Sequence, residues 1–352
     1  MTGPEPRLRA VLNTLSSRPR AMTDSIYRAH ANECPYPPVR AVIESVNEAG
    51  AAMNRYPDDR CSELVRAIAE DLLVPTAHVA VGPGSTAIVQ QLLLATVEHG
   101  DEVVFSWPSF ERYPTLSAVA GARPVSVPLR GPDQDLRGLA EAVTARTRLI
   151  FIGNPNDPTG TSVDRRDLDV FLERVPSDVL VILDEEYQES TDAPSGPDGV
   201  RLHLERPNVA VVRSFSHANG LAGLRVGFAI ARPAVARAVR RTGLPYAVDV
   251  MAQAAALASL RAKAEVSERV LALRRERDRV AGFLRARGWR IPAAGGNFLW
   301  LPLGDRSAEF RRACADLGVA VHEVHRTGVR VTIREVEANN LVLFVASRFS
   351  AA

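Results

Sequence analysis

Short runs of β-branched and other apolar residues alternate with amphipathic stretches through the middle of the chain, and this alternation constrains the fold most. Several runs are apolar at every position, as expected of strands covered by helices on both faces. Strands that alternate with helices form a parallel sheet wound with right-handed crossovers, so the fold class is α/β. The predicted strands are Val79–Val81, Glu102–Ser106, Leu149–Ile152, Leu180–Leu183, Val209–Ser214 and Arg225–Ile230, with helices at Ser62–Asp71, Ala87–Val97 and Leu168–Arg174.

The pattern changes at about Ala247, where a long helical stretch begins. The stretch is alanine-rich at first and then charged, and Gly288 supplies a C-cap. The predicted elements after it are the strands Asn297–Leu301, Val319–His322, Val329–Ile333 and Leu341–Val345, and the helix Ser307–Asp316. We therefore predict an N-terminal arm and part of a small domain over 1–45, a large domain over 46–264, and a C-terminal small α+β domain over 265–352.

Composition excludes several classes of protein. The 352 residues suffice for one large or two ordinary domains. Lys and Arg total 43 against 41 Asp and Glu, a net charge of +2, which is too balanced for nucleic acid or an anionic membrane to be the main partner. No apolar run reaches about 18 residues, and the N-terminus lacks the apolar core of a signal peptide. Three widely spaced cysteines fit reduced thiols, so we expect a cytoplasmic protein.

A glycine-rich turn, Gly82-Pro83-Gly84-Ser85-Thr86, follows a predicted strand and opens a helix. Free backbone N–H groups and hydroxyls at a helix start form an anion site. Taken alone, a purely structural turn explains the segment equally well. The segment also matches a loose dinucleotide pattern, but Asp101 and Glu102 precede the next strand instead of ending it, so we reject that interpretation.

Three further polar turns follow strands, at the edge where open α/β sheets bind ligands. They are NPNDPTG at 154–160, DEEY at 184–187 and SFSHANGLAGLR at 214–225. Each has an ordinary reading as a turn or helix cap. Their order, together with PSF at 108–110, GVRVTI at 328–333 and RYPD at 55–58, resembles the aminotransferase class I/II family, closest to histidinol-phosphate aminotransferase-like members. The resemblance spans about residues 30 to 340.

The resemblance implies a fold-type I aminotransferase, with a large domain built on a mainly parallel seven-stranded sheet and a smaller α+β domain. It implies a homodimeric enzyme of amino-acid metabolism that binds pyridoxal phosphate (PLP) in the large domain. By motif match, the residues that would hold the cofactor phosphate are Gly84, Ser85, Thr86, Ser214, Ser216 and Arg225, with Tyr56 reaching the phosphate of the neighbouring subunit.

The remaining site residues also follow from the resemblance. Phe110 would stack on the cofactor ring, and Asp184 would pair with the ring nitrogen, which makes the ring an electron sink. Tyr187 would donate to the phenolic oxygen, a contact that the family shares with an asparagine where this chain has Asp157. Arg330 would hold a substrate carboxylate as a bidentate pair.

The main departure from the family is His217. The family has at this turn the lysine that bonds covalently to PLP, whereas an imidazole cannot form that bond. Lys263, the only lysine, lies in the long helical stretch and is read as a solvated helix residue. His217 can still move protons, since an unperturbed imidazole has a pKa of about 6.5. In this one residue the chain is similar to fold-type I sugar 3-dehydratases that use histidine with pyridoxamine phosphate (PMP).

We therefore expect an aminotransferase-like enzyme that binds PLP or PMP non-covalently and acts on an amino acid or amine, with His217 and Tyr187 as catalytic residues. Transamination, decarboxylation, elimination and racemisation all stay open. The alternatives are a non-catalytic binding or partner protein, an engineered lysine-to-histidine variant and, most distant, a dehydrogenase. No metal is expected, because a strand would place His322 and His325 on opposite faces.

Overall fold

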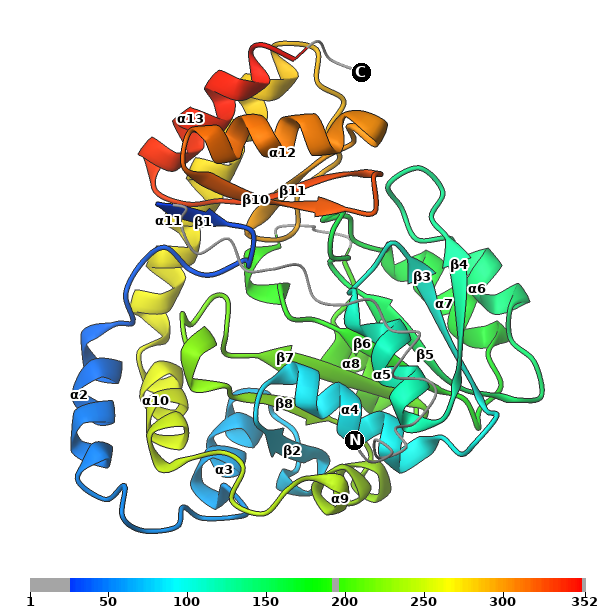
Figure 1. Cartoon of the computed structure of the whole chain (residues 1–352). Coiled ribbons are helices and arrows are strands. Elements are labelled where there is room, and N and C mark those ends of the chain that lie inside the picture. Colours follow the sequence, from blue (N-terminus) through cyan, green and yellow to red (C-terminus); the bar gives the residue numbers. More distant parts are fainter. Residues whose placement is uncertain (1–25, 192–195, 350–352) are drawn as a thin grey trace, which may run out of the picture.

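The computed structural model describes residues 26–191 and 196–349, and it contains two sheets (Figure 1). The larger sheet has seven strands in the order β2-β8-β7-β6-β5-β3-β4. All neighbouring pairs are parallel except those made by β8, which runs antiparallel to β7 and β2. Its strands are β2 (Val79–Gly82), β3 (Glu102–Trp107), β4 (Arg123–Pro128), β5 (Thr147–Gly153), β6 (Leu180–Asp184), β7 (Val209–Ser214) and β8 (Gly227–Ile230). The predicted α/β class with a mainly parallel sheet is confirmed.

Helices cover both faces of this sheet, which explains the strands that are apolar at every position. In β3, Val103 and Phe105 pack into one core cluster and Val104 packs into the other. The first face carries α4 (Ser85–Thr96), α5 (Arg112–Ala120) and α9 (Pro233–Thr242). The second carries α3 (Ser62–Asp71), α6 (Leu136–Glu141), α7 (Arg165–Arg174), α8 (Gly199–Glu205) and α10 (Val250–Arg261), with α2 (Arg40–Gly50) packed on α10.

The smaller sheet belongs to a second domain, which lies above the carboxyl edge of the larger sheet in Figure 1. It joins β1 from the N-terminal part to three C-terminal strands in the order β1-β10-β11-β9. Its elements are β1 (Tyr27–Ala29), β9 (Phe298–Leu301), β10 (Val319–Val324), β11 (Gly328–Thr332), α11 (Lys263–Arg285), α12 (Ser307–Asp316) and α13 (Val336–Ala346). Short 3-10 helices are η1 (Thr76–His78), η2 (Gln188–Ser190), η3 (Ala222–Leu224) and η4 (Gly304–Arg306).

The long helical stretch is divided into α10 and α11 at Ala262. Lys263 begins α11 and forms an ion pair with Asp71 of α3, where its side chain is 57% exposed. The only lysine of the chain therefore lies in a surface ion pair. Residues 1–25 of the predicted N-terminal arm lie outside the described residues.

One predicted strand, Leu341–Val345, is wrong, because these residues belong to α13. Val342, Leu343 and Val345 are buried in the core of the small domain, so an almost uniformly apolar run conceals the helical period. β1 and β4 were not predicted: β1 has only three residues, and β4 contains two prolines, which an edge strand tolerates. Within the described residues, no helix is both long enough and apolar enough to cross a membrane.

Helix α4 offers a matched test of the core. Leu92 is fully buried between α4 and the sheet, whereas Leu94 is 48% exposed on the same helix. We expect Leu92→Ala to lower the free energy of unfolding by about 2–5 kcal/mol, because a cavity replaces packed methyl groups. Leu94→Ala should change it by about 0.5 kcal/mol or less. Urea unfolding followed by circular dichroism measures both, and equal losses would contradict this assignment of the core.

Candidate active site

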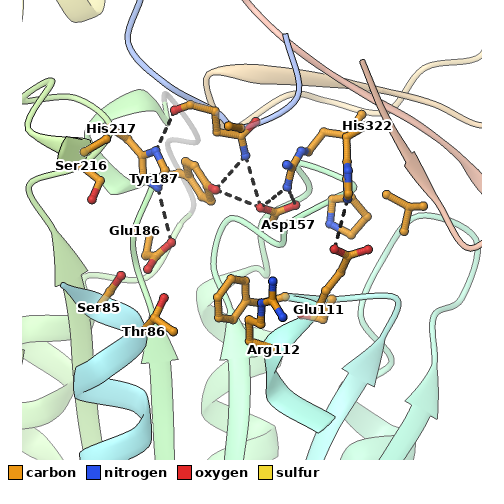
Figure 2. A pocket seen from close by; sticks show the side chains of 18 of the residues that line it. Ser85, Thr86, Glu111, Arg112, Asp157, Glu186, Tyr187, Ser216, His217 and His322 are labelled. Atoms are coloured by element: carbon orange, nitrogen blue, oxygen red, sulfur yellow. Dashed lines mark hydrogen bonds and ion pairs between the residues drawn. The ribbon is translucent and has the colours of Figure 1, made fainter. Parts of the chain in front are cut away.

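A cavity of about 240 Å³ lies at the carboxyl edge of the large sheet, and both domains line it (Figure 2). The loops after four neighbouring parallel strands meet there, as the topology requires. The lining residues of the large domain are Ser85, Thr86, Ser109, Phe110, Glu111, Arg112, Asp157, Pro158, Glu186, Tyr187, Ser216, His217, Ala222 and Arg225. Those of the small domain and the segment after β1 are Ala31, Asn32, His322, Val324 and Arg330. Most residues predicted from the motifs therefore share one cavity.

The start of α4 and the loop after β7 form a narrow anion cradle. Ser85 and Thr86 open the helix, whose N-terminus carries partial positive charge. Arg225, in the left-handed backbone region, donates from Nη1 to Ser216 Oγ at 3.2 Å. A Cβ at Gly84 would collide with the Arg225 guanidinium, so glycine permits this approach. Backbone amides, hydroxyls and a guanidinium together suit a phosphate group.

Ser214 does not line the cavity. Its side chain is buried and donates to Ser216 Oγ at 2.8 Å, so it contacts the cradle only through that serine. Phe110 does line the cavity and packs edge-on against Tyr113, with ring centroids 5.3 Å apart.

Asp184 ends β6 and is buried with one oxygen unpaired. Its Oδ2 accepts a hydrogen bond from Tyr113 Oη at 2.6 Å, whereas Oδ1 has no hydrogen-bond partner among the described residues. Burial, reinforced by the negative charge of Glu186, raises the pKa of Asp184 well above its ordinary value. A cationic N–H donor would satisfy Oδ1 and lower that pKa again. This unpaired oxygen fits the protonated ring nitrogen that the sequence predicted for Asp184.

His217 is hydrogen-bonded through both ring nitrogens. Nδ1 lies 2.8 Å from the carbonyl oxygen of Asn32, and Nε2 lies 3.4 Å from Oε2 of Glu186, both acceptors (Figure 2). The two side chains are each only 12% exposed. Two acceptors require two N–H donors, so this geometry favours the imidazolium form.

The pKa directions agree with this ion pair. Burial acts to lower the pKa of His217, but the hydrogen bond and charge of Glu186 outweigh it, and the pKa is raised. Burial acts to raise the pKa of Glu186, yet its bond to His217 outweighs this and the pKa is lowered. Sequence reasoning missed Glu186. The sequence signal that was available is its position two residues after Asp184, at the end of a predicted strand. In the structure the intervening Glu185 points away from the cavity and bonds to Arg213.

A second buried ion pair joins the domains. Arg330 of β11 bonds both carboxylate oxygens of Asp157, and Asp157 Oδ2 also accepts from Tyr187 Oη at 2.9 Å. Asn32 Nδ2 donates to Tyr187 Oη at 2.8 Å. The hydroxyl proton of Tyr187 is therefore directed at Asp157. Asn32 was not predicted to lie in the site.

The predicted placement of two histidines is wrong. We expected His322 and His325 on opposite faces of a strand, but β10 ends at Val324 and His325 lies in the following turn with φ of 44°. Their Nε2 atoms approach the same carboxylate, that of Glu111, at 3.2 and 3.6 Å. No group of three or more His, Cys, Asp or Glu able to hold a metal occurs in the part of the chain that is described.

Tyr56 lies outside this cavity. Its side chain stacks on Tyr246 with ring centroids 4.6 Å apart, and the residue is 82% exposed. Its expected contact is with a neighbouring subunit, so that role stays a prediction.

Comparison with known proteins now decides the family. The family described as "Aminotransferase class I and II" matches residues 30–343. The chain belongs to this family. An aromatic amino acid aminotransferase of Streptomyces avermitilis is 50% identical over 99% of both chains, and one of Thermobifida fusca is 50% identical over 91% of this chain and 89% of its own length.

Solved structures confirm the fold. A histidinol-phosphate aminotransferase from Sinorhizobium meliloti in complex with pyridoxal-5'-phosphate has a TM-score of 0.89 at 24% identity, and covers 98% of this chain and 99% of its own. A Thermus thermophilus aspartate aminotransferase with maleate has a TM-score of 0.84 at 21% identity, with coverage of 98% and 100%. The predictions of fold-type I and of an aminotransferase-like enzyme are confirmed, and the family implies PLP or PMP as cofactor.

The imidazolium–carboxylate pair leads to a prediction. Glu186→Gln removes the charge that raises the pKa of His217 and leaves burial, which lowers it, so the pKa should fall below that of the native protein. Histidine side-chain NMR across a pH titration measures the change. Glu111→Gln removes a carboxylate from the same cavity without contacting His217, and should leave that pKa in place. Equal effects of the two variants would contradict the pairing.

Proposed function

We propose that the chain is an aminotransferase-type enzyme that binds PLP or PMP non-covalently and acts on an amino acid or amine, with His217 as its proton carrier. The observation that carries this proposal is the His217–Glu186 ion pair beside an unpaired, buried Asp184 oxygen and a complete anion cradle. The names of the relatives, aromatic amino acid aminotransferases, favour a substrate with an aromatic side chain.

The residues of the cavity suit such a cofactor. Ser85, Thr86, Ser216 and Arg225 would hold its phosphate, and Asp184 Oδ1 would accept from its ring nitrogen, as argued above. Phe110 would cover one face of the ring. When bound, the cofactor supplies an electron sink that acidifies the carbon bearing the amino group.

His217 then moves the proton at Nε2. The carbonyl of Asn32 accepts from Nδ1, which fixes the ring and leaves Nε2 as the exchanging nitrogen. Release of the Nε2 proton, which Glu186 accepts in the resting ion pair, gives the neutral imidazole. In that form Nε2 would take a proton from the amino-bearing carbon, and Glu186 would stabilise the imidazolium that results. The His217 imidazolium can then return this proton to another atom of the bound reactants that lies within its reach. Tyr187 packs against the imidazole, with ring centroids 4.5 Å apart, and restricts its tilt.

We also propose a cytoplasmic homodimer. All three cysteines are free, which suits a reducing compartment. The exposed, stacked pair Tyr56 and Tyr246 supplies an aromatic surface for a second copy of the chain, which would bring Tyr56 toward the phosphate of its neighbour.

The second candidate function is a non-catalytic binding or partner protein, and the missing lysine favours it. An engineered lysine-to-histidine change would leave the same sequence. Restoring the lysine separates these cases: His217→Lys should form a covalent, borohydride-reducible bond to PLP if the pocket still places the cofactor correctly.

Cofactor uptake tests the pocket. We expect native protein to bind PMP, followed by its absorbance and by equilibrium dialysis. Asp184→Ala should weaken binding at least tenfold, because the ring nitrogen loses its only buried carboxylate partner. Asp305→Ala removes a carboxylate whose side chain is 86% exposed on the small domain and should have no effect. Failure of native protein to bind PMP at saturating concentration would overturn the proposal.

Proton exchange tests the role of His217. With PLP present, deuterium from solvent should enter the amino-bearing carbon of the substrate, measured by mass spectrometry. His217→Gln should slow exchange about 10²–10⁴-fold while PMP binding persists. Exchange requires neutral His217, whose pKa is raised above the ordinary histidine value of about 6.5. The exchange rate should therefore rise with pH over a range that lies above that ordinary value. Exchange that is unaffected in His217→Gln would favour the non-catalytic alternative.

A further inference from the structure

Arg330, the residue expected to bind a substrate carboxylate, is already bonded to a carboxylate of the chain itself. Its Nη1 donates to both oxygens of Asp157, at 2.5 Å for Oδ2, and its Nη2 donates to the carbonyl of His30 at 2.7 Å. The Arg330 and Asp157 side chains are only 12% and 13% exposed. Only Nε lacks a hydrogen-bond partner among the described residues, and it is buried.

Asp157 is also held in place by hydrogen bonds from residues of both domains. Tyr187 Oη donates to its Oδ2 at 2.9 Å and Asn32 Nδ2 approaches the same oxygen at 3.3 Å. Asn32 is itself fixed, since Thr332 Oγ1 donates to its side-chain oxygen at 2.8 Å and accepts from its backbone N–H at 3.0 Å. Turning Asp157 away from Arg330 would break several of these bonds at once, so the ion pair is a built part of the cavity.

The charge of this corner decides what it can bind. A guanidinium paired with a carboxylate has no net charge to offer an anion, and an incoming carboxylate would be repelled by Asp157 about as strongly as it is attracted by Arg330. The two-donor face formed by Nη1 and Nη2 already donates to Asp157 and to the His30 carbonyl, and the unpaired Nε is buried. An uncharged group at the same place meets neither obstacle. Asparagine, which the family has here, would leave the guanidinium unneutralised.

We propose that Asp157 is a specificity-determining residue: by neutralising Arg330 it selects a primary amine without a carboxylate, such as an arylalkylamine, over an α-amino acid. This inference rests on the proposed function, since it narrows the substrate class of the same cavity. The aromatic portion of the substrate would lie along Phe110 and Val324, which line the cavity.

Ligand binding to the cofactor-free protein tests the inference without any turnover. The probes are 3-phenylpropionate and 3-phenylpropanamide, which share their size and differ in charge, followed by ligand-observed NMR titration. Asp157→Asn is nearly isosteric and frees Arg330, so it should bind 3-phenylpropionate at least tenfold more tightly than native protein does. The affinity for 3-phenylpropanamide should change less than threefold.

Two controls make the result specific. The double variant Asp157→Asn/Arg330→Met should lose the gained affinity for 3-phenylpropionate, because the freed guanidinium is gone. Asp157→Ser repeats the test if the asparagine variant does not fold, as judged by its thermal transition. Equal carboxylate affinity in native and variant proteins, or no carboxylate binding by either folded variant, would overturn the inference.

A second measurement separates this inference from the proposed function. In native protein loaded with PLP, deuterium exchange should be at least tenfold faster for 2-phenylethylamine than for L-phenylalanine, and Asp157→Asn should reverse that order. If the protein takes up no cofactor, the proposed function fails, whereas the binding result with 3-phenylpropionate still decides the role of Asp157. Preference of the loaded native protein for L-phenylalanine would contradict the inference.

Discussion

The ion pair between His217 and Glu186 is the interaction on which the cavity depends. A carboxylate buried beside an anion cradle would be costly if it were unpaired, and it would repel a phosphate. The imidazolium of His217 neutralises it, and the carbonyl of Asn32 stabilises the same imidazolium from the other side. Glu186 and His217 therefore stabilise each other's charged form, which keeps a protonated, hydrogen-bonded group at the turn after β7.

The architecture explains why these groups can be brought together. Parallel strands β5, β6 and β7 end at one edge, so Asp157 and His217 line one cavity and Asp184 is buried near its residues Glu186 and Asp157, although the chain between them is long. The small domain closes this edge from above with Asn32 and Arg330, which form polar contacts with Tyr187, His217 and Asp157. Asn297 Nδ2 also donates to the Asn32 carbonyl at 2.9 Å, which fixes the residue that orients His217. The cavity is thus assembled mainly from the loops that follow these strands.

Much of this arrangement could be predicted from sequence, because its strongest signals are local. The apolar strands of the large sheet and the turns that follow them identify the edge, and the motifs at residues 84–86, 184–187 and 214–225 contain eight of the nineteen residues that line the cavity. The strand predicted at Leu341–Val345 failed because a buried helix and a buried strand look alike over five apolar residues. The pairing of Glu186 with His217 and of Asp157 with Arg330 could not be predicted, since each joins residues that are distant in the chain. Similarly, the placement of His325 depended on a turn with positive φ that no local signal marked.

The central claim is that the cavity retains a cofactor site in which an imidazole takes the place of the covalent lysine. A crystal structure of the native protein with PMP tests it most directly. The account predicts the phosphate on Ser85 and Arg225, the ring nitrogen on Asp184 Oδ1, and His217 Nε2 facing the amino-bearing carbon. PMP absent from this cavity at saturating concentration, or bound there with Asp184 Oδ1 still unpaired, would contradict it.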